Sequence, residues 1–145
     1  MAFFGVFGEG REARAHFEQR ALYLVCPFIH FSLDGRVALC HDGAKTLEEL
    51  VLFPPSLFAG TASHGRITLA RSTLATLYRR YGKRLYRRLS SPASFALYDA
   101  KRGTLLLGGV HGEKCYIEES DGALFFSSVP TLLRAPIPID LAILK

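Results

Sequence analysis

Ser94-Phe95-Ala96-Leu97-Tyr98-Asp99 is the stretch that decides the fold, because it has the composition of one half of a β-hairpin. Turn residues follow it at Lys101-Arg102-Gly103, and an apolar run with Leu105-Leu106-Leu107 comes after the turn. Two apolar runs of strand length around a glycine-containing turn are typical of antiparallel pairing. We therefore predict a hairpin that pairs residues 94–99 with residues 104–109.

A second hairpin is predicted further along the chain. It pairs residues 114–118 with residues 123–127 around the turn Ser120-Asp121-Gly122. The two hairpins follow each other closely in the sequence, so we expect both to lie in one sheet.

The N-terminal half is predicted to supply further strands. Residues 3–7 are apolar and are expected to form a short, buried strand in a central position. Residues 28–33 and 37–40 are predicted to form a hairpin around Asp34-Gly35, a turn-forming pair. The charged segment of residues 10–20 is interpreted as a loop or as one or two helical turns.

Two short elements complete this half of the chain. Residues 22–25 are predicted to form a strand, and residues 46–50 a short helix that begins at Thr46 as N-cap. The segment Phe53-Pro54-Pro55 ends that helix.

Residues 72–89 are predicted to form the longest helix, lying on a face of the sheet. Leucine and tyrosine residues recur along it at three- and four-residue intervals, which gives one apolar stripe. The stripe consists of Leu74, Leu77, Tyr78, Tyr81, Leu85 and Leu89. Gly82 costs a helix about 1 kcal/mol relative to alanine, so we expect a kink or break there.

Six cations lie opposite this apolar stripe, in a chain whose formal net charge is +5. They are Arg79, Arg80, Lys83, Arg84, Arg87 and Arg88. Such a face is usually only solvated, but it can also bind an acidic protein or neutralise the phosphates of a nucleic acid. Because the sequence holds no nucleic-acid-binding motif, we favour an acidic protein as partner and keep nucleic acid as the alternative.

Length and composition fit a single domain over residues 1–145, with an extended tail over residues 135–145. Proline and isoleucine alternate in this tail at Pro136, Ile137, Pro138 and Ile139. An apolar extended segment tends to pack against its own chain or a neighbouring one. The tail is therefore a candidate contact with a second copy of the chain.

Other features of the sequence exclude several classes of protein. No apolar run approaches the roughly 20 residues that span a bilayer, so we expect no membrane contact and a cytoplasmic location. Cys26, Cys40 and Cys115 lie in apolar contexts and are expected to be reduced and buried. No cysteine and histidine spacing suits zinc, and we expect neither a metal nor a cofactor.

Four blocks of the sequence are Leu77-Tyr78-Arg79-Arg80-Tyr81-Gly82, Ser94-Phe95-Ala96-Leu97-Tyr98-Asp99, Gly112-Glu113-Lys114-Cys115-Tyr116 and Leu124-Phe125-Phe126-Ser127-Ser128-Val129-Pro130-Thr131-Leu132-Leu133. In the same order and at similar spacing, they resemble blocks in the glutaminase half of asparagine synthetases. That half is a glutamine amidotransferase type 2 domain, which has an N-terminal nucleophile. The resemblance covers about residues 72–133 and implies an α+β fold, a trimmed αββα sandwich of antiparallel sheets flanked by few helices.

The catalytic cysteine of that family has no counterpart at the start of this chain. The family begins Met-Cys-Gly-Ile-x-Gly, and its cysteine supplies both the nucleophilic thiol and the α-amine that acts as base. The matching string here is Phe4-Gly5-Val6-Phe7-Gly8, so Phe4 stands at the nucleophile position. Removal of Met1 would expose Ala2, which has no nucleophile either.

The supporting residues of that family are replaced as well. Its oxyanion loop corresponds here to Asp42-Gly43, where a carboxylate replaces an amide donor and would repel a developing oxyanion. The arginine that grips the glutamine carboxylate has no counterpart between Gly10 and Cys40, and the aspartate that holds the glutamine amine aligns near Ala70. Nucleophile, oxyanion donor and both substrate clamps are missing together.

The resemblance therefore implies a non-catalytic domain, similar to the N-terminal domains of β-lactam synthetases and lasso-peptide cyclases. We expect a scaffold, substrate-presenting or regulatory subunit for a separately encoded, ATP-dependent, amide-forming synthetase. One alternative is a sensor that binds a small ligand in the vestigial pocket. The other is nucleic-acid binding through the basic helix at residues 78–88.

Overall fold

The structure, a computed structural model, describes residues 3–8, 10–22, 29–32, 34–41, 57–63, 71–90, 92–120 and 122–145. The helical elements are α1 (Arg11–Ala21), α3 (Arg71–Tyr81) and the 3-10 helices η1 (Gly82–Arg88) and η2 (Pro130–Leu132). The strands are β1 (Phe3–Phe7), β2 (Ile29–Phe31), β3 (Val37–His41), β4 (Leu57–Ser63), β5 (Ala93–Asp99), β6 (Thr104–Val110), β7 (Cys115–Ser120), β8 (Ala123–Ser127), β9 (Ile137–Ile139) and β10 (Leu141–Leu144).

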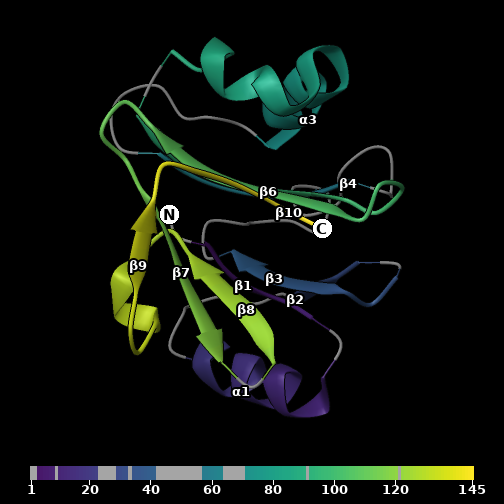
Figure 1. The fold of residues 1–145 in the computed structure, drawn as a ribbon, viewed down its shortest axis with the longest axis vertical. Helices are drawn as coiled ribbons and strands as arrows, with labels where there is room; N and C mark the ends of the chain where they lie inside the picture. The colour runs from purple at the N-terminus through teal and green to yellow at the C-terminus, as the bar shows by residue number, and fades with distance from the viewer. Residues whose placement is uncertain are drawn as a thin grey trace.

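Two stacked antiparallel sheets form the centre of the molecule. One sheet has six strands in the order β2-β3-β1-β8-β7-β9, and the other has four in the order β10-β6-β5-β4. Helix α1 covers the outer face of the six-stranded sheet, and α3 with η1 covers the outer face of the four-stranded sheet (Figure 1). The architecture is thus the expected αββα sandwich, and β1 occupies the expected central position. Within the described residues, no helix is both long and apolar enough to span a membrane.

Side-chain alternation along the strands divides the core into three apolar layers. On β1, Phe3 points between the two sheets, whereas Phe4 packs on the α1 side. On β5, Tyr98 points between the sheets, whereas Phe95 and Leu97 pack under α3 and η1. Every residue of β5 is buried because both faces of the strand are covered.

Both predicted hairpins form, but they lie in different sheets. Strands β5 and β6 pair within the four-stranded sheet, and β7 and β8 pair within the six-stranded sheet. The chain changes sheets at His111 and Gly112, which have left-handed backbone angles φ of 54° and 92°. The expectation of a single sheet was therefore wrong, because this turn redirects the chain instead of continuing the meander.

The N-terminal half differs from the sequence prediction in two elements. Residues 10–20 contain a full helix, α1, in place of a loop or one or two turns; its buried side chains, Ala13, Phe17 and Ala21, recur every four residues. Strand β4, which pairs with β5, was not predicted. The hairpin around Asp34-Gly35 is confirmed, with β2 shorter than predicted. Leu22 is the C-cap of α1 and begins no strand; residues 23–25, 46–50 and 53–55 lie outside the described residues.

The predicted extended tail is part of both sheets. Strand β9 pairs with β7 at an edge of the six-stranded sheet, and β10 pairs with β6 at an edge of the four-stranded sheet. Edge positions suit the tail because proline cannot donate a ladder hydrogen bond. Ile137 and Ile143 remain 58% and 41% exposed, so part of the apolar tail still faces outward.

Two tyrosine hydroxyls join the layers. Tyr98, on β5, donates to Asp34 in the β2–β3 turn and so links the two sheets. Tyr78, on α3, donates to Asp99 over 2.8 Å and ties that helix to β5. Burial, together with the hydrogen bond to a carboxylate, raises the pKa of each tyrosine to about 12. Both hydroxyls therefore stay protonated, and able to donate, across the physiological range.

The predicted helix breaks at Gly82, where α3 ends and η1 begins. Gly82 has a left-handed φ of 59°, and a Cβ added there would meet nothing within 4 Å. We therefore expect Gly82→Ala to destabilise the protein by about 1 kcal/mol, because alanine is strained in this conformation. Equilibrium unfolding in urea would measure the change. Gly82→Asn should lose less stability than Gly82→Ala. A continuous helix predicts that Gly82→Ala is more stable than wild type, and that result would contradict the break.

Candidate functional site

Phe4, which stands at the expected nucleophile position, belongs to the core. Its side chain is 0% exposed. Its ring stacks on Phe17 of α1 at 5.2 Å and on Phe125 of β8 at 6.2 Å between centroids. The position therefore contributes packing to the layer between α1 and the six-stranded sheet. It presents no reactive group to a substrate.

The glycine that follows Phe4 also has a packing reason. A Cβ on Gly5 would lie 2.3 Å from Cζ of Phe126 and 2.8 Å from the carbonyl oxygen of Ala38. Glycine here leaves room for the Phe126 ring between the two sheets. Core packing is therefore sufficient to explain why residue 5 is glycine.

The polar groups beside the start of β1 are engaged with backbone. The Ser128 hydroxyl accepts from the Phe3 N–H at 3.0 Å, and the Ser127 hydroxyl donates to the Phe3 carbonyl at 3.1 Å. Cys115 is buried, and burial raises the pKa of its thiol to about 12. A thiol with that pKa stays protonated at neutral pH and is a poor nucleophile.

Other residues named from the sequence are placed as follows. Cys40 is buried, as predicted. Asp42 and Gly43, which the sequence predicted as the counterpart of the oxyanion loop, lie outside the described residues, as do Cys26 and Ala70. Within the described part of the chain, no group of three His, Cys, Asp or Glu side chains is positioned to hold a metal ion.

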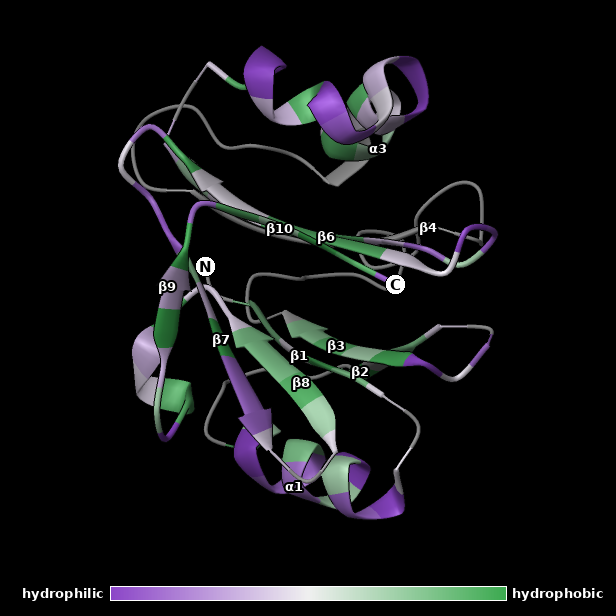
Figure 2. Ribbon diagram, in the orientation of Figure 1, coloured by the Kyte–Doolittle hydropathy of each residue, from purple (hydrophilic) through white to green (hydrophobic). Residues whose placement is uncertain are grey.

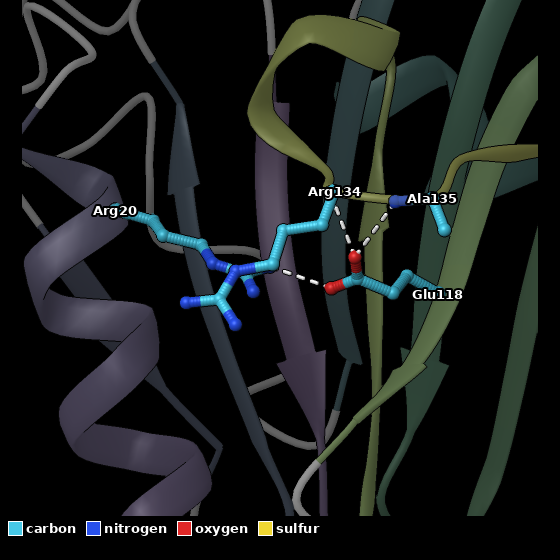
Figure 3. Close-up of polar contacts among 4 residues, drawn as sticks. All are labelled: Arg20, Glu118, Arg134 and Ala135. Atoms are coloured by element: carbon cyan, nitrogen blue, oxygen red, sulfur yellow. Dashed lines mark hydrogen bonds and ion pairs between the residues drawn. The ribbon is translucent and has the colours of Figure 1, made fainter.

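A buried carboxylate fastens α1 and the C-terminal segment to the six-stranded sheet. Glu118 of β7 is 5% exposed and accepts from Arg20 of α1 at 2.7 Å. Its other oxygen accepts from the N–H groups of Arg134 and Ala135 at 2.7 and 3.1 Å, as Figure 3 shows. Burial alone would raise the pKa of Glu118, but these hydrogen bonds and the Arg20 charge outweigh it and lower the pKa. Sequence reasoning missed this pair, since the two residues are 98 positions apart.

The six predicted cations gather on the outside of the four-stranded layer. All are exposed, on the last turn of α3 and on η1. We call Arg79, Arg80, Lys83, Arg84, Arg87 and Arg88 the basic surface. Figure 2 shows hydrophilic colour on the outer side of this helical segment and hydrophobic colour on the sheet below it.

Aromatic rings order part of the basic surface. The guanidinium of Arg88 lies 4.4 Å from the centroid of Tyr81, and that of Arg80 lies 5.5 Å from the same ring. Arg87 lies 5.7 Å from the ring of Tyr86 and donates to its hydroxyl at 3.2 Å. Stacked guanidinium groups lose less side-chain freedom on binding than fully mobile ones.

The positive charge of the chain is concentrated here. Residues 71–88 hold seven of the 18 Lys and Arg residues and none of the 13 Asp and Glu residues, so acids outnumber Lys and Arg in the rest of the chain. Two sheets separate this surface from Phe4, which lies in the α1 layer. The structure thus brings the six cations together and keeps them apart from Phe4, the nucleophile position predicted from the sequence.

Comparison with solved structures identifies the fold. A glutamine phosphoribosylpyrophosphate amidotransferase from B. subtilis, in complex with ADP and GMP, matches with a TM-score of 0.69 and 12% sequence identity. The match covers 99% of this chain and 47% of that protein, so this chain spans about half its length. No family model and no curated protein matches the sequence. At this identity the likeness shows the fold alone, which is the N-terminal-nucleophile hydrolase sandwich.

The lowered pKa of Glu118 predicts how the free energy of unfolding changes at low pH. Because its folded pKa lies below the ordinary value of 4.5, its contribution is complete above pH 4.5 and is lost as the pH falls through the folded value. Glu118→Gln should therefore lose about 3 kcal/mol at pH 7, because Arg20 is left without its counter-charge, and should lose less relative to wild type at pH 3. Urea unfolding at both pH values measures this.

The matched control is the double variant Arg20→Met with Glu118→Gln, which removes the unpaired cation and keeps a side-chain oxygen to accept from the Arg134 and Ala135 N–H groups. It should recover much of the stability lost in Glu118→Gln. A Glu118→Gln loss that is the same at pH 3 and pH 7 would contradict the role given to the charge.

Proposed function

We propose that this chain is a non-catalytic, asparagine-synthetase-type amidotransferase-like domain. It serves as a scaffold, substrate-presenting or regulatory subunit for a separately encoded, ATP-dependent, amide-forming synthetase. The observation that carries the proposal is the complete burial of Phe4 between Phe17 and Phe125. The fold is that of an enzyme class, while the position that would hold its nucleophile is occupied by core packing.

The absence of glutaminase chemistry follows from what each catalytic part requires. The reaction needs a thiol and a base at the start of the central strand, and Phe4 supplies neither. The buried Cys115 thiol, with a pKa of about 12, does not substitute for it. The serines beside Phe3 are hydrogen-bonded to its backbone.

The basic surface is the proposed docking site for the synthetase. Its cations are exposed, and no acid lies within residues 71–88 to offset them. A surface of one sign speeds association with an acidic partner and suppresses wrong ones, more than it adds affinity. We therefore expect the partner to present clustered carboxylates, and the association to weaken as salt is added.

Two alternative partners are each favoured by one observation. Arginines stacked on Tyr81 also suit single-stranded nucleic acid, which combines cations with aromatic rings. A second copy of this chain is the other alternative, through the exposed isoleucines Ile137 and Ile143 of the edge strands β9 and β10. We favour the acidic protein because the sequence contains no nucleic-acid-binding motif.

The purified protein should release no glutamate from glutamine above a buffer blank. Alkylation of its cysteines should change nothing, because no thiol takes part in turnover. Phe4→Cys should remain inactive as well, because a side chain at this position points into the α1 layer. Glutamate release that is abolished by thiol alkylation would overturn the non-catalytic assignment.

Charge reversal tests the docking site. The triple variant Arg80→Glu, Arg84→Glu, Arg88→Glu should weaken binding to a synthetase encoded beside this chain by about tenfold or more. Titration calorimetry at two salt concentrations measures the affinity, and the melting temperature should stay near that of wild type because all three side chains are exposed.

The matched control reverses three exposed cations elsewhere, in Arg11→Glu, Lys101→Glu, Arg134→Glu. It should bind the synthetase nearly as well as wild type. Salt-sensitive RNA binding lost only in the first triple would move nucleic acid to first place. Equal synthetase binding by wild type and both triples would reject the basic surface as the docking site.

A further inference from the structure

A cavity opens at the end of the sandwich opposite the vestigial nucleophile position. Its volume is about 1020 Å³, and Phe7 and Gly8, at the far end of β1 from Phe4, form part of its wall. Glu119 and Ser120 at the end of β7 form another part together with Gly122, and Leu144 at the end of β10 lines the cavity from the four-stranded sheet. A volume of this size is ample for a small organic molecule.

Arg36 is the fixed charge of this cavity. Its guanidinium carbon lies 4.9 Å from the centroid of the Phe7 ring. On the β5–β6 turn, a Cβ added to Gly103 would lie 2.7 Å from Nη1 of Arg36, so the guanidinium rests directly against that glycine. Arg36 is therefore held by both sheets at once, and it is half-buried.

The neighbouring carboxylate of Asp34 is already engaged. One of its oxygens accepts from the Ser32 hydroxyl at 2.7 Å and from the Arg36 N–H at 3.1 Å, and the other accepts from the Tyr98 hydroxyl. Asp34 thus fixes the turn that carries Arg36. A planar guanidinium held in this way is suited to bidentate recognition of an oxyanion.

The other residues that line the cavity include an apolar group and a charged group. Phe7, Leu124 and Leu144 supply apolar wall, and Glu119 and Lys145 are the other charged groups among the lining residues that the structure describes. Glu119 and Lys145 are both exposed, so solvent and salt screen their charges. Among the described lining residues, the charged side chain that is half-buried and held in a defined position is Arg36, and the neighbouring Asp34 carboxylate offsets part of its charge.

We infer that this cavity is a binding site for a small organic anion with an apolar body. The oxyanion would lie on Arg36, and the body would pack against Phe7, Leu124 and Leu144. The site is independent of the basic surface and does not require the proposed synthetase subunit role. It also lies away from Phe4, so it differs from a sensor built on the vestigial pocket.

Two fluorescent probes with the same ring system isolate the anion contribution. These are 1-anilinonaphthalene-8-sulfonate, which is anionic, and N-phenyl-1-naphthylamine, which is neutral. Both should bind the folded protein. In Arg36→Met the sulfonate should bind about tenfold more weakly, the loss expected for a charge-assisted hydrogen bond, while the neutral probe should be unaffected.

Two further variants locate the site. Leu144→Trp fills the cavity and should weaken both probes. Arg134→Met removes an exposed arginine that does not line the cavity and should change neither. Near-UV circular dichroism must show that each variant is folded. If Leu144→Trp fails this check, the probe-induced shifts of the Gly8 and Ser120 amide resonances in the wild-type protein locate the site instead.

Specific outcomes overturn the inference. Failure of the folded wild-type protein to bind either probe would reject the cavity as a binding site. Equal weakening of both probes in Arg36→Met would reject recognition of the anion. Amide shifts confined to residues outside the cavity would place the probes elsewhere and reject the location.

Discussion

The aromatic stack of Phe17, Phe4 and Phe125 is the interaction on which the rest of the structure depends. Strand β1 lies between β3 and β8, so it joins strands from the two ends of the chain into one sheet. Phe4 is the point at which that strand also holds α1. A polar nucleophile at this position would remove the stack and leave a void in the layer. Under the proposed function, the packing of the domain and the chemistry of an N-terminal-nucleophile enzyme compete for this one residue, and packing occupies it.

The second sheet is held to the first by polar and covalent connections at several points. Tyr98 reaches Asp34 across the interface, the chain crosses between β6 and β7, and it crosses back between β9 and β10. These connections bring the C-terminal segment into the core framework, so removing it would disturb both sheets. The outer side of α3 and η1 makes no such connection between the sheets. A surface free of packing constraints can carry a cluster of like charges, and the proposed docking function is assigned to this surface.

The sequence predicted those elements whose signals are local. The turns at Asp34-Gly35 and Lys101-Arg102-Gly103 and the break at Gly82 each depend on a few adjacent residues. Helix α1 was underestimated because alanines supply two of its three buried positions, which weakens the apolar stripe. The division of the hairpins between sheets depends on pairings such as Phe4 with Ser127, which no local pattern encodes. The basic surface was found because its residues all lie between positions 79 and 88, whereas the Arg36 cavity was missed because its walls come from distant strands.

Native-state hydrogen exchange of the β1 amides tests most directly whether position 4 is a structural position. If Phe4 is sealed in the core, the amides of Phe4, Gly5 and Val6 should exchange only through global unfolding. Their opening free energy should then equal the unfolding free energy obtained from urea titration. The contrary result is exchange of the Phe4 amide with an opening free energy several kcal/mol below the global unfolding free energy. Such exchange would show that the start of β1 opens locally and that position 4 is accessible to solvent. That result would contradict the account.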